Sequence, residues 1–306
     1  MTVLETIQKS AEFLSKKGVD SPRLQAELLL AHVLKLPRMK LYLNFERQLA
    51  QPETDAMREF VKRRGQREPL QHILGSTSFC GLEIAASRQA LVPRPETELL
   101  AELGWQFLNE LTSSSSSSRR EEAHSKTRPS QSLLTSAATV LDFGTGSGCV
   151  AIALAVKCPS ARVWALDVSP EALGVAKQNA ARNGVAERIQ FLCGKGFASL
   201  PKDTQFDLIV SNPPYIPTGE IASLQPEVRD YDPRGALDGG EDGLDFYRLL
   251  AAQADPFLKS GGRIMLEFGD GQAEAVSRIF SDQKWIVEEV KEDYSQRQRI
   301  MIARRE

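Results

Sequence analysis

The sequence has few of the residues that build metal sites and disulfide frameworks. It contains three histidines and four cysteines in 306 residues, and no two cysteines have C-x-x-C spacing. The histidines are scattered as well, so neither a metal site nor a disulfide scaffold is expected. We expect reduced, mostly buried thiols, as in a protein of the cytoplasm. The cysteines are Cys80, Cys149, Cys158 and Cys193.

A strong charge of one sign is also absent. Lysine and arginine number 38 against 40 acidic residues, a net charge of -2, which argues against wrapping nucleic acid by neutralising its phosphates. No apolar run approaches the roughly 18 residues of a membrane-spanning helix. The start, MTVLETIQKS, lacks the basic and apolar regions of a secretory signal. We therefore expect a cytoplasmic protein without a membrane partner and without direct contact to nucleic acid.

The pattern of apolar residues changes along the chain. Residues 1–75 have apolar positions at helical spacing, which predicts a small helical domain. Residues 76–92 hold short β-prone pieces around Gly81, which predict a hairpin linker. In residues 93–306, seven apolar strand segments alternate with helices. This predicts an α/β fold with a doubly wound, mostly parallel seven-stranded sheet covered by helices on both faces.

Residues 112–136 interrupt this pattern with six consecutive serines and mixed charge. Such a segment cannot bury enough apolar area to offset its ordering entropy, so we interpret it as a flexible surface insertion. A regulatory or phosphorylated segment is the alternative interpretation.

A basic group lies on the helix expected after Pro52. It is either a solvated helix face or a surface that docks a partner. The group consists of Lys62, Arg63, Arg64 and Arg67.

The segment LDFGTGSG, Leu141 to Gly148, follows the first strand of the alternating region and precedes a helix. Its three glycines let the backbone approach a ligand, but such loops also bind dinucleotides or serve tight packing. It has no lysine in the P-loop position, which argues against nucleoside triphosphate hydrolysis. The glycines are Gly144, Gly146 and Gly148.

Two acidic residues narrow the choice of ligand. Asp142 ends the first strand, and Asp167 ends the second, where a carboxylate can accept both hydroxyls of a ribose. Proteins that bind NAD share the second acid but do not usually have the first. A loop that receives the cationic methionine end of S-adenosylmethionine has a use for it. The D-x-G-x-G-x-G pattern resembles the first motif of class I methyltransferases.

The stretch VSNPPYIP, Val210 to Pro217, follows the expected fourth strand. Pro213 and Pro214 have no N–H and a fixed φ, so the backbone is stiff and its carbonyls can face a ligand. The side-chain oxygen of Asn212 and the Pro213 carbonyl could each accept one hydrogen of a planar –NH2 group, with Tyr215 over its face. Two fixed acceptors would orient such a nitrogen and stabilise the positive charge that develops on methylation.

At these residues the sequence becomes similar to known families. NPPY resembles the motif shared by adenine-N6 DNA methyltransferases and protein glutamine methyltransferases. Three further segments look like the peptide chain release factor glutamine methyltransferases, the HemK-type family, and the resemblance covers nearly the whole chain except the serine-rich segment. These segments are REPLQHILG (67–75), LVPRPETELL (91–100) and PEVRDYDPRGALDGGEDGLDFYR (226–248).

The resemblance implies a class I S-adenosyl-L-methionine-dependent methyltransferase. Its substrates would be class I peptide chain release factors, methylated on the side-chain nitrogen (N5) of the glutamine in the Gly-Gly-Gln motif, and the enzyme is expected to be a monomer. The family's donor site matches Asp142, Gly144, Thr145, Gly146, Ser147, Gly148, Asp167, Gly196 and Asn212. Its glutamine site matches Asn212, Pro213, Pro214 and Tyr215.

The resemblance also gives expectations for the surroundings of the site. The family's helical domain helps to dock the release factor, which favours the docking interpretation of the basic group. Arg94 and Glu96 are expected near the mouth of the site or as braces of the domain hinge. After the third strand, Lys195 and Gly196 replace the family's usual aspartate and bulky residue near the adenine. Because an ammonium group accepts no hydrogen bond, we expect adenine binding to be weaker or differently organised.

Two other functions stay open as alternatives. An adenine-N6 nucleic-acid methyltransferase would want a basic recognition region with aromatic residues, and the near-neutral balance argues against it. A non-catalytic methyl-donor-binding protein would need an altered NPPY segment, which is intact here.

Overall fold

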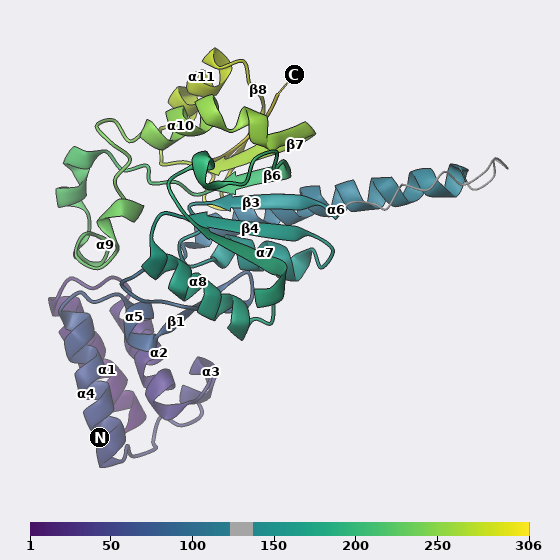
Figure 1. The fold of residues 1–306 in the computed structure, drawn as a ribbon. Coiled ribbons are helices and arrows are strands. Elements are labelled where there is room, and N and C mark those ends of the chain that lie inside the picture. The colour runs from purple at the N-terminus through teal and green to yellow at the C-terminus, as the bar shows by residue number, and fades with distance from the viewer. Residues whose placement is uncertain (123–136, 306) are drawn as a thin grey trace.

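Five helices form the N-terminal part of the chain. The computed structural model describes residues 1–122 and 137–305, and Figure 1 shows these helices beside the sheet, at the lower end of the view. α1 begins after Thr2, whose hydroxyl accepts the Glu5 N–H while the Glu5 carboxylate accepts the Thr2 N–H. Apolar side chains of these helices form a core of their own. The helices are α1 (Val3–Lys16), α2 (Pro22–Leu34), α3 (Arg38–Leu41), α4 (Gln51–Gly65) and α5 (Leu70–Leu74).

A hairpin follows the helical part. β1 (Ser76–Phe79) pairs antiparallel with β2 (Leu82–Ala85). Cys80 and Gly81 form the turn with φ of 51° and 77°, the left-handed values that a type I′ turn requires at both positions. The Cys80 N–H donates to Glu98 on the next helix at 2.8 Å, which fastens the turn to the larger part of the molecule.

The remaining strands form one sheet in the order β5-β4-β3-β6-β7-β9-β8. The strands from β5 to β7 are parallel, and β9 is antiparallel to its neighbours β7 and β8. The predicted mostly parallel, seven-stranded sheet is therefore confirmed. The strands are β3 (Thr139–Phe143), β4 (Arg162–Asp167), β5 (Ile189–Cys193), β6 (Phe206–Ser211), β7 (Leu258–Glu267), β8 (Ile286–Glu292) and β9 (Gln298–Arg304).

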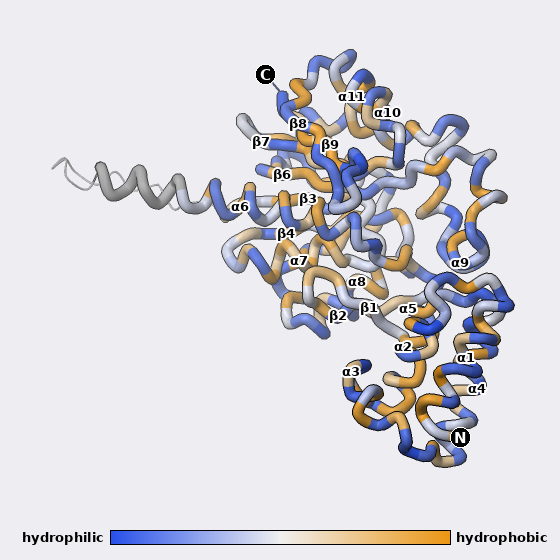
Figure 2. Tube along the Cα trace, turned by 180° about the vertical axis from the view of Figure 1, so that it is seen from behind, coloured by the Kyte–Doolittle hydropathy of each residue, from blue (hydrophilic) through white to orange (hydrophobic). Residues whose placement is uncertain are grey.

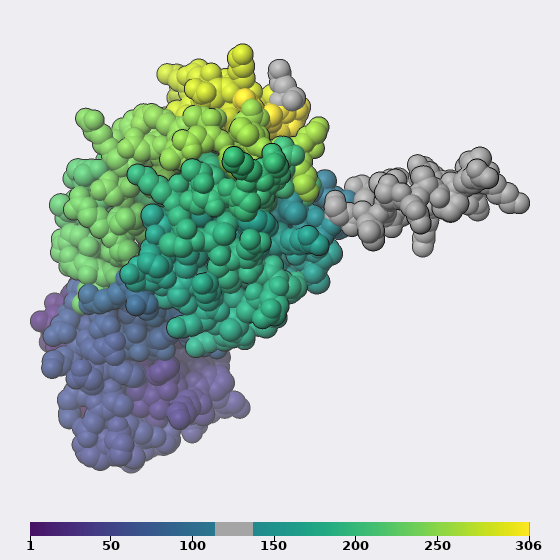
Figure 3. Space-filling view, in the orientation of Figure 1, coloured from purple at the N-terminus to yellow at the C-terminus, as the bar shows by residue number. Residues whose placement is uncertain are grey.

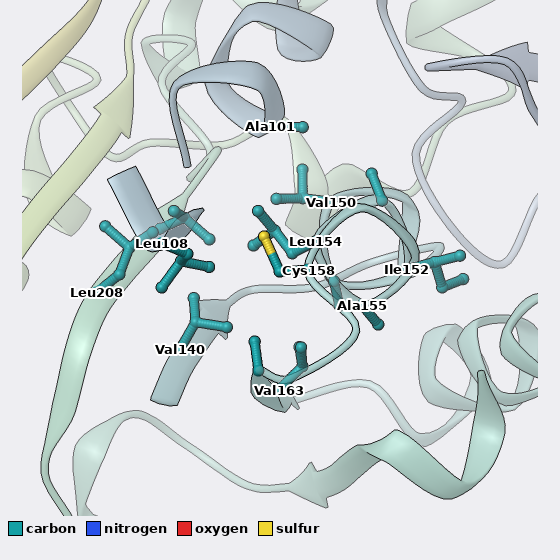
Figure 4. Packing of buried hydrophobic residues seen from close by; sticks show 14 of the residues in the cluster. Ala101, Leu108, Val140, Val150, Ile152, Leu154, Ala155, Cys158, Val163 and Leu208 are labelled. Atoms are coloured by element: carbon teal, nitrogen blue, oxygen red, sulfur yellow. The ribbon is translucent and has the colours of Figure 1, made fainter. Parts of the chain in front are cut away.

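Helices cover both faces of the sheet, and both faces are apolar. Successive residues of a strand point to opposite faces, so a strand that is apolar throughout contributes to both clusters. Val140 of β3 faces the cluster shared with α6 and α7, while Leu141 faces the cluster shared with α10 and α11. Figure 4 shows part of the first cluster, with Leu154 of α7 above Val140. In Figure 2, hydrophobic residues are frequent along the strands of the sheet. The helices are α6 (Pro95–Glu122), α7 (Cys149–Lys157), α8 (Pro170–Arg182), α10 (Asp245–Gln253) and α11 (Ala273–Asp282).

The serine-rich segment differs from the expectation in its first part. We expected residues 112–136 to be flexible, but α6 continues as a helix to Glu122 and extends past the sheet (Figure 1). Extending a helix adds one hydrogen bond for each residue fixed, so a helix nucleated by packed turns can run into residues of modest propensity. Residues 123–136 lie outside the described part of the chain.

The connection between β6 and α10 returns to the helical part. It contains α9 (Pro226–Arg229), which lies just above these helices in Figure 1, and the two parts meet in close contact in Figure 3. Glu227 accepts hydrogen bonds from Arg64 at 2.7 Å and from Arg67 at 2.7 and 2.6 Å. Burial alone would raise the Glu227 pKa, but the bonds from Arg67 and Arg64 hold it below its ordinary value. This network joins the helical part to the connection.

The same contacts decide the role of the basic group on α4. Arg63 pairs with Glu68 at 2.6 Å, and Arg64 and Arg67 pair with Glu227. The Arg64 side chain is only 4% exposed. Arg64 therefore serves an internal ion pair, and the expectation of a solvated face or a docking surface is wrong for it. The side chains of Arg63 and Arg67 are 32% and 21% exposed beside their ion pairs, and their part in docking stays a prediction. Lys62 is exposed.

We predict that Glu227→Gln lowers the free energy of unfolding by about 3 kcal/mol, because it leaves the buried Arg64 guanidinium without a full counter-charge. The measurement is urea-induced unfolding at neutral pH. Glu220→Gln, the same change at an exposed position of the same connection, is the control and should stay within about 0.5 kcal/mol of wild type. Equal effects of the two substitutions would contradict the prediction.

Candidate active site

Four parallel strands end at one edge of the sheet, three of them in the polar residues Asp167, Ser211 and Glu267 and the fourth, β3, one residue after Asp142. β3, β4, β6 and β7 are parallel neighbours, so their carboxyl ends lie together (Figure 1). After β3 the chain adds β4 and then β5 on one side of β3, and it continues with β6 on the other side. The direction in which strands are added therefore reverses between β3 and β6, which makes this the switch point of the sheet. Ligands of open α/β sheets bind outside the strand ends at such a point.

The glycine loop lies at this switch point, between β3 and α7. All three glycines have φ between 54° and 80°. A Cβ added to Gly144 or Gly146 would meet no atom within 4 Å, so this side of the loop is open to a ligand. A Cβ on Gly148 would come within 2.9 Å of Ala176, so this glycine permits close packing of α7 against α8. Two glycines thus open the loop and the third positions it.

Asp142 braces the loop from within. Its Oδ2 accepts the Thr145 hydroxyl at 2.7 Å and the Ala151 N–H at 3.1 Å. The side chain is buried, and burial raises its pKa to about 7 against these two hydrogen bonds. We expected this carboxylate to face the cationic end of a ligand. One of its oxygens is instead used to fix the loop, and contact of the other with a ligand stays a prediction.

Asp167 connects the glycine loop to the next helix. Its Oδ2 accepts the Gly146 N–H at 2.8 Å, and its Oδ1 accepts the Ser169 N–H at 2.9 Å. The Ser169 hydroxyl in turn caps α8 by accepting the Ala172 N–H at 3.1 Å. Val168, the residue after Asp167, is 67% exposed, so an apolar side chain lies in solvent next to this carboxylate. The carboxylate is therefore fixed in direction while remaining half-exposed.

The segment after β5 presents backbone rather than side chains to the same edge. Lys195 is exposed, and Gly196 has a φ of 70°. The Phe197 ring is buried between Phe143 and Phe257, with ring centroids 4.9 Å from each. This ring is used in the core, so a base could meet only the backbone at this residue.

The Asn-Pro-Pro-Tyr segment begins where β6 ends. Nδ2 of Asn212 donates to the Thr97 hydroxyl at 3.0 Å, which turns Oδ1 to the other side. Among the described residues, no hydrogen bond reaches Asn212 Oδ1 or the Pro213 carbonyl. The Tyr215 carbonyl is held by Gln272 at 2.9 Å, and burial raises the Tyr215 pKa to about 12, so its hydroxyl stays neutral. The segment offers two free acceptors on a fixed backbone.

Sequence reasoning missed two buried residues of this site. They are Thr97, at the start of α6, and Glu267, the last residue of β7, and both are 2% exposed. The Thr97 hydroxyl accepts a hydrogen bond from Asn212 Nδ2. Hydrogen bonds from Thr97 and Asn212 lower the pKa of the Glu267 carboxyl group. Glu267 had a detectable signal, because a carboxylate closes the apolar run RIMLE at the same edge as Asp142 and Asp167. Thr97 had none, since its part depends on the packing of α6 against the sheet.

Arg94 lies between the hairpin and α6, and its guanidinium donates to Asp232 Oδ2 at 2.7 Å. Burial raises the Asp232 pKa, opposed by Arg94, and Oδ1 of Asp232 has no partner among the described residues. Arg94 therefore braces the connection between β6 and α10, which fits the hinge interpretation. Glu96 is exposed.

The described residues contain no group of three or more His, Cys, Asp or Glu side chains placed to bind a metal ion. None of the described helices combines the length and hydropathy of a membrane span. The site contains an open glycine cradle, a fixed carboxylate beside it and two free acceptors. Such an arrangement can bind a nucleoside and orient an –NH2 group beside it.

Two family models match the sequence. The PrmC N-terminal domain matches residues 5–75, and the methyltransferase small domain matches residues 130–224. The first covers the helical part, and the second contains the glycine loop, Asp167 and Asn212.

Curated relatives match over almost the whole chain. The release factor glutamine methyltransferase of Geobacter sulfurreducens is 44% identical, covering 92% of this chain and 88% of its own length. That of Chlorobaculum tepidum is 42% identical over 89% of this chain and 87% of its own length. A bifunctional methyltransferase of Rickettsia bellii is 34% identical over 98% of this chain and 54% of its own length. With this coverage, the chain belongs to the release factor glutamine methyltransferase family.

Proposed function

We propose that this protein transfers a methyl group from S-adenosyl-L-methionine to the side-chain amide nitrogen of the glutamine in the Gly-Gly-Gln motif of class I release factors. The observation that carries this proposal is the pair of free acceptors, Asn212 Oδ1 and the Pro213 carbonyl, beside the glycine loop. Membership of the family supplies the substrate class. Because release factors act on the ribosome, we infer that the reaction takes place in the cytoplasm.

The donor would lie across the glycine loop. Gly144 to Gly148 leave room for it, and Asp167 would accept the ribose hydroxyls with the lone pairs not used by Gly146 and Ser169. Asp142 Oδ1 and Asn212 would face its methionine end, and the Gly196 backbone would lie near its base. When bound, the donor supplies the electrophilic methyl group. The residues fit it, because the loop is open where a ligand approaches and carboxylates lie at both ends.

The acceptor amide needs orientation more than activation. Its nitrogen is a poor nucleophile, because the lone pair is delocalised into the carbonyl group. Asn212 and Pro213 would each accept one N–H, hold the nitrogen in line with the methyl group and stabilise the positive charge that develops on it. In favourable cases, such orientation lowers a barrier by about 7–11 kcal/mol. Pro214 keeps the backbone stiff, and Tyr215 would pack over the amide plane.

The same acceptors would also fit the amino group of adenine. The glutamine substrate is favoured because the helical part matches the PrmC N-terminal domain and because a release factor glutamine methyltransferase matches 92% of this chain. Glu227 of the connection between β6 and α10 forms ion pairs with Arg64 and Arg67 of the helical part.

The test is mass spectrometry of peptides from a purified bacterial release factor after incubation with this protein and S-adenosyl-L-methionine. We expect a single added methyl group on the glutamine of Gly-Gly-Gln. An unmodified release factor, with donor binding shown in parallel, would contradict the proposal. DNA offered with labelled donor should stay unlabelled.

We predict that Asn212→Ala and Asp167→Ala have separate effects. Asn212→Ala should lower turnover by at least about 10²–10³-fold, through loss of a positioned acceptor, while the dissociation constant of the donor changes little. Asp167→Ala should mainly weaken donor binding, since it removes the ribose acceptor and loosens the Gly146 amide. Single-turnover kinetics and calorimetry measure both quantities, and the opposite distribution of effects would show the assigned roles to be wrong.

We predict that Lys195→Asp tightens donor binding about three- to tenfold, because a carboxylate can accept a hydrogen bond from the adenine amino group and an ammonium cannot. Calorimetric titration with the donor measures this. Lys202→Asp changes the charge equally at another exposed position and is the control. Equal affinities of the two variants would show that residue 195 does not contact the base.

A further inference from the structure

Thr97 is a buried polar residue in the first turn of α6, and the packing of that helix holds it beside Asn212. It is only 2% exposed. Gly104, two turns further along the same face of α6, lets the helix lie close to the sheet. A Cβ at Gly104 would come within 3.0 Å of Leu154 and within 3.5 Å of Leu208 on β6. Because β6 ends one residue before Asn212, this close packing brings the start of α6 to the acceptor segment.

The hydrogen of the Thr97 hydroxyl is not directed at Asn212. Thr97 donates it to the Glu267 carboxyl group, so the hydroxyl oxygen remains available as an acceptor. Asn212 Nδ2 donates to that oxygen at 3.0 Å. Asn212 also hydrogen bonds to the Glu267 carboxyl group. The amino end of the Asn212 amide therefore meets two groups that accept hydrogen bonds.

These contacts distinguish two orientations of the Asn212 amide that differ little in shape. Turning the amide by half a turn exchanges an oxygen for an –NH2 group of similar size, so packing alone hardly selects one orientation. The turned amide would direct Oδ1 at the Thr97 oxygen and at the Glu267 carboxyl group. It would also direct its own N–H groups toward the place of the substrate –NH2 group. Two donors facing each other form no hydrogen bond, so the turned amide could not hold that nitrogen.

We propose that Thr97 is a positioning residue for methyl transfer, whose hydroxyl selects the orientation of Asn212 in which Oδ1 faces the substrate nitrogen. This proposal rests on the proposed function. Thr97 acts through Asn212 and does not contact the substrate. Its effect therefore belongs to the rate of methyl transfer and not to the binding of the donor.

The test removes the hydroxyl and keeps the shape of the side chain. Thr97→Val should lower the single-turnover rate of methyl transfer to a purified release factor about 10–30-fold, because nothing then accepts from Asn212 Nδ2 at this position. The dissociation constants of donor and release factor should stay within about twofold of wild type. Thr97→Ser keeps the hydroxyl and should stay within about threefold of the wild-type rate. The assay is run at about pH 8.5, where the ionised Glu267 carboxylate can only accept hydrogen bonds.

Thr6→Val is the matched control. Thr6 is 3% exposed, and its hydroxyl donates to the Thr2 carbonyl at 2.8 Å in the helical part. The same change at this position should leave the rate within about twofold of wild type. Thr97→Ala serves if valine disturbs the fold, since it also lacks the hydroxyl, and it should be slowed as much as Thr97→Val within about threefold. A wild-type rate in either variant without the Thr97 hydroxyl would overturn the proposal.

A double-mutant cycle separates positioning from a general effect on the fold. Asn212→Ala leaves no amide to orient, so adding Thr97→Val to it should change the remaining rate by less than about twofold. If Thr97→Val slowed both backgrounds equally, Thr97 would not act through Asn212 and the proposal would be wrong. A wild-type enzyme that leaves the glutamine unmethylated would instead contradict the proposed function.

Discussion

The hydrogen bond from Asn212 Nδ2 to Thr97 determines what the candidate site can recognise. An asparagine side chain has two donor hydrogens on one end and an acceptor oxygen on the other. Because Thr97 takes the donor end, the acceptor end is presented, and the site is suited to an –NH2 group rather than to a carbonyl group. The Pro213 carbonyl adds a second acceptor, since a segment with two prolines has fewer N–H groups that could pair with it. The packing of α6 against the sheet therefore sets the polarity of the site.

Two carboxyl groups at this edge are buried and have a pKa of about 7, but they differ in their contacts. Oδ2 of Asp142 accepts one hydrogen bond from Thr145 in the glycine loop and one from Ala151 in α7, so this oxygen holds the loop against the helix. Oε2 of Glu267 has no hydrogen-bond partner in the described part of the chain. Both pKa values are above those of an unfolded chain, so each group favours folding at low pH. That contribution is lost as the pH rises from about 4 through about 7. These two buried carboxyl groups thus lower the free energy of unfolding at neutral pH relative to acidic pH.

Sequence reasoning predicted the parts of the fold that depend on local signals. The seven strands follow from short apolar runs, and α8 begins at Pro170 after the Ser169 cap and ends before Gly184. It did not predict that Arg64 and Arg67 bind Glu227, because the partners are 163 and 160 residues apart in the chain. A run of arginines looks the same in a sequence whether it faces solvent or an internal carboxylate.

The site residues show the same division. The glycine loop and Asn-Pro-Pro-Tyr are continuous segments whose chemistry can be derived from residue type and spacing, and the structure places both at the switch point. Thr97 and Glu267 come from separate elements, and their part in the site exists only once α6, β6 and β7 are packed together. Asp142 illustrates a third case: its position was predicted, but its direction was not, because its Oδ2 bonds to the Ala151 N–H in the following helix.

The connection between β6 and α10 relates substrate docking to the chemistry. It starts at Asn212, and Glu227 within it is fixed to the helical part by Arg64 and Arg67, while Asp232 is fixed by Arg94. A rigid-body movement of the helical part would therefore pull on the segment that, in the proposed function, holds the acceptor nitrogen. Since orientation accounts for much of the rate in such a reaction, loss of these ion pairs would be expected to slow methyl transfer although they lie outside the site. A protein substrate that contacts both the helical part and this connection would hold them in one arrangement.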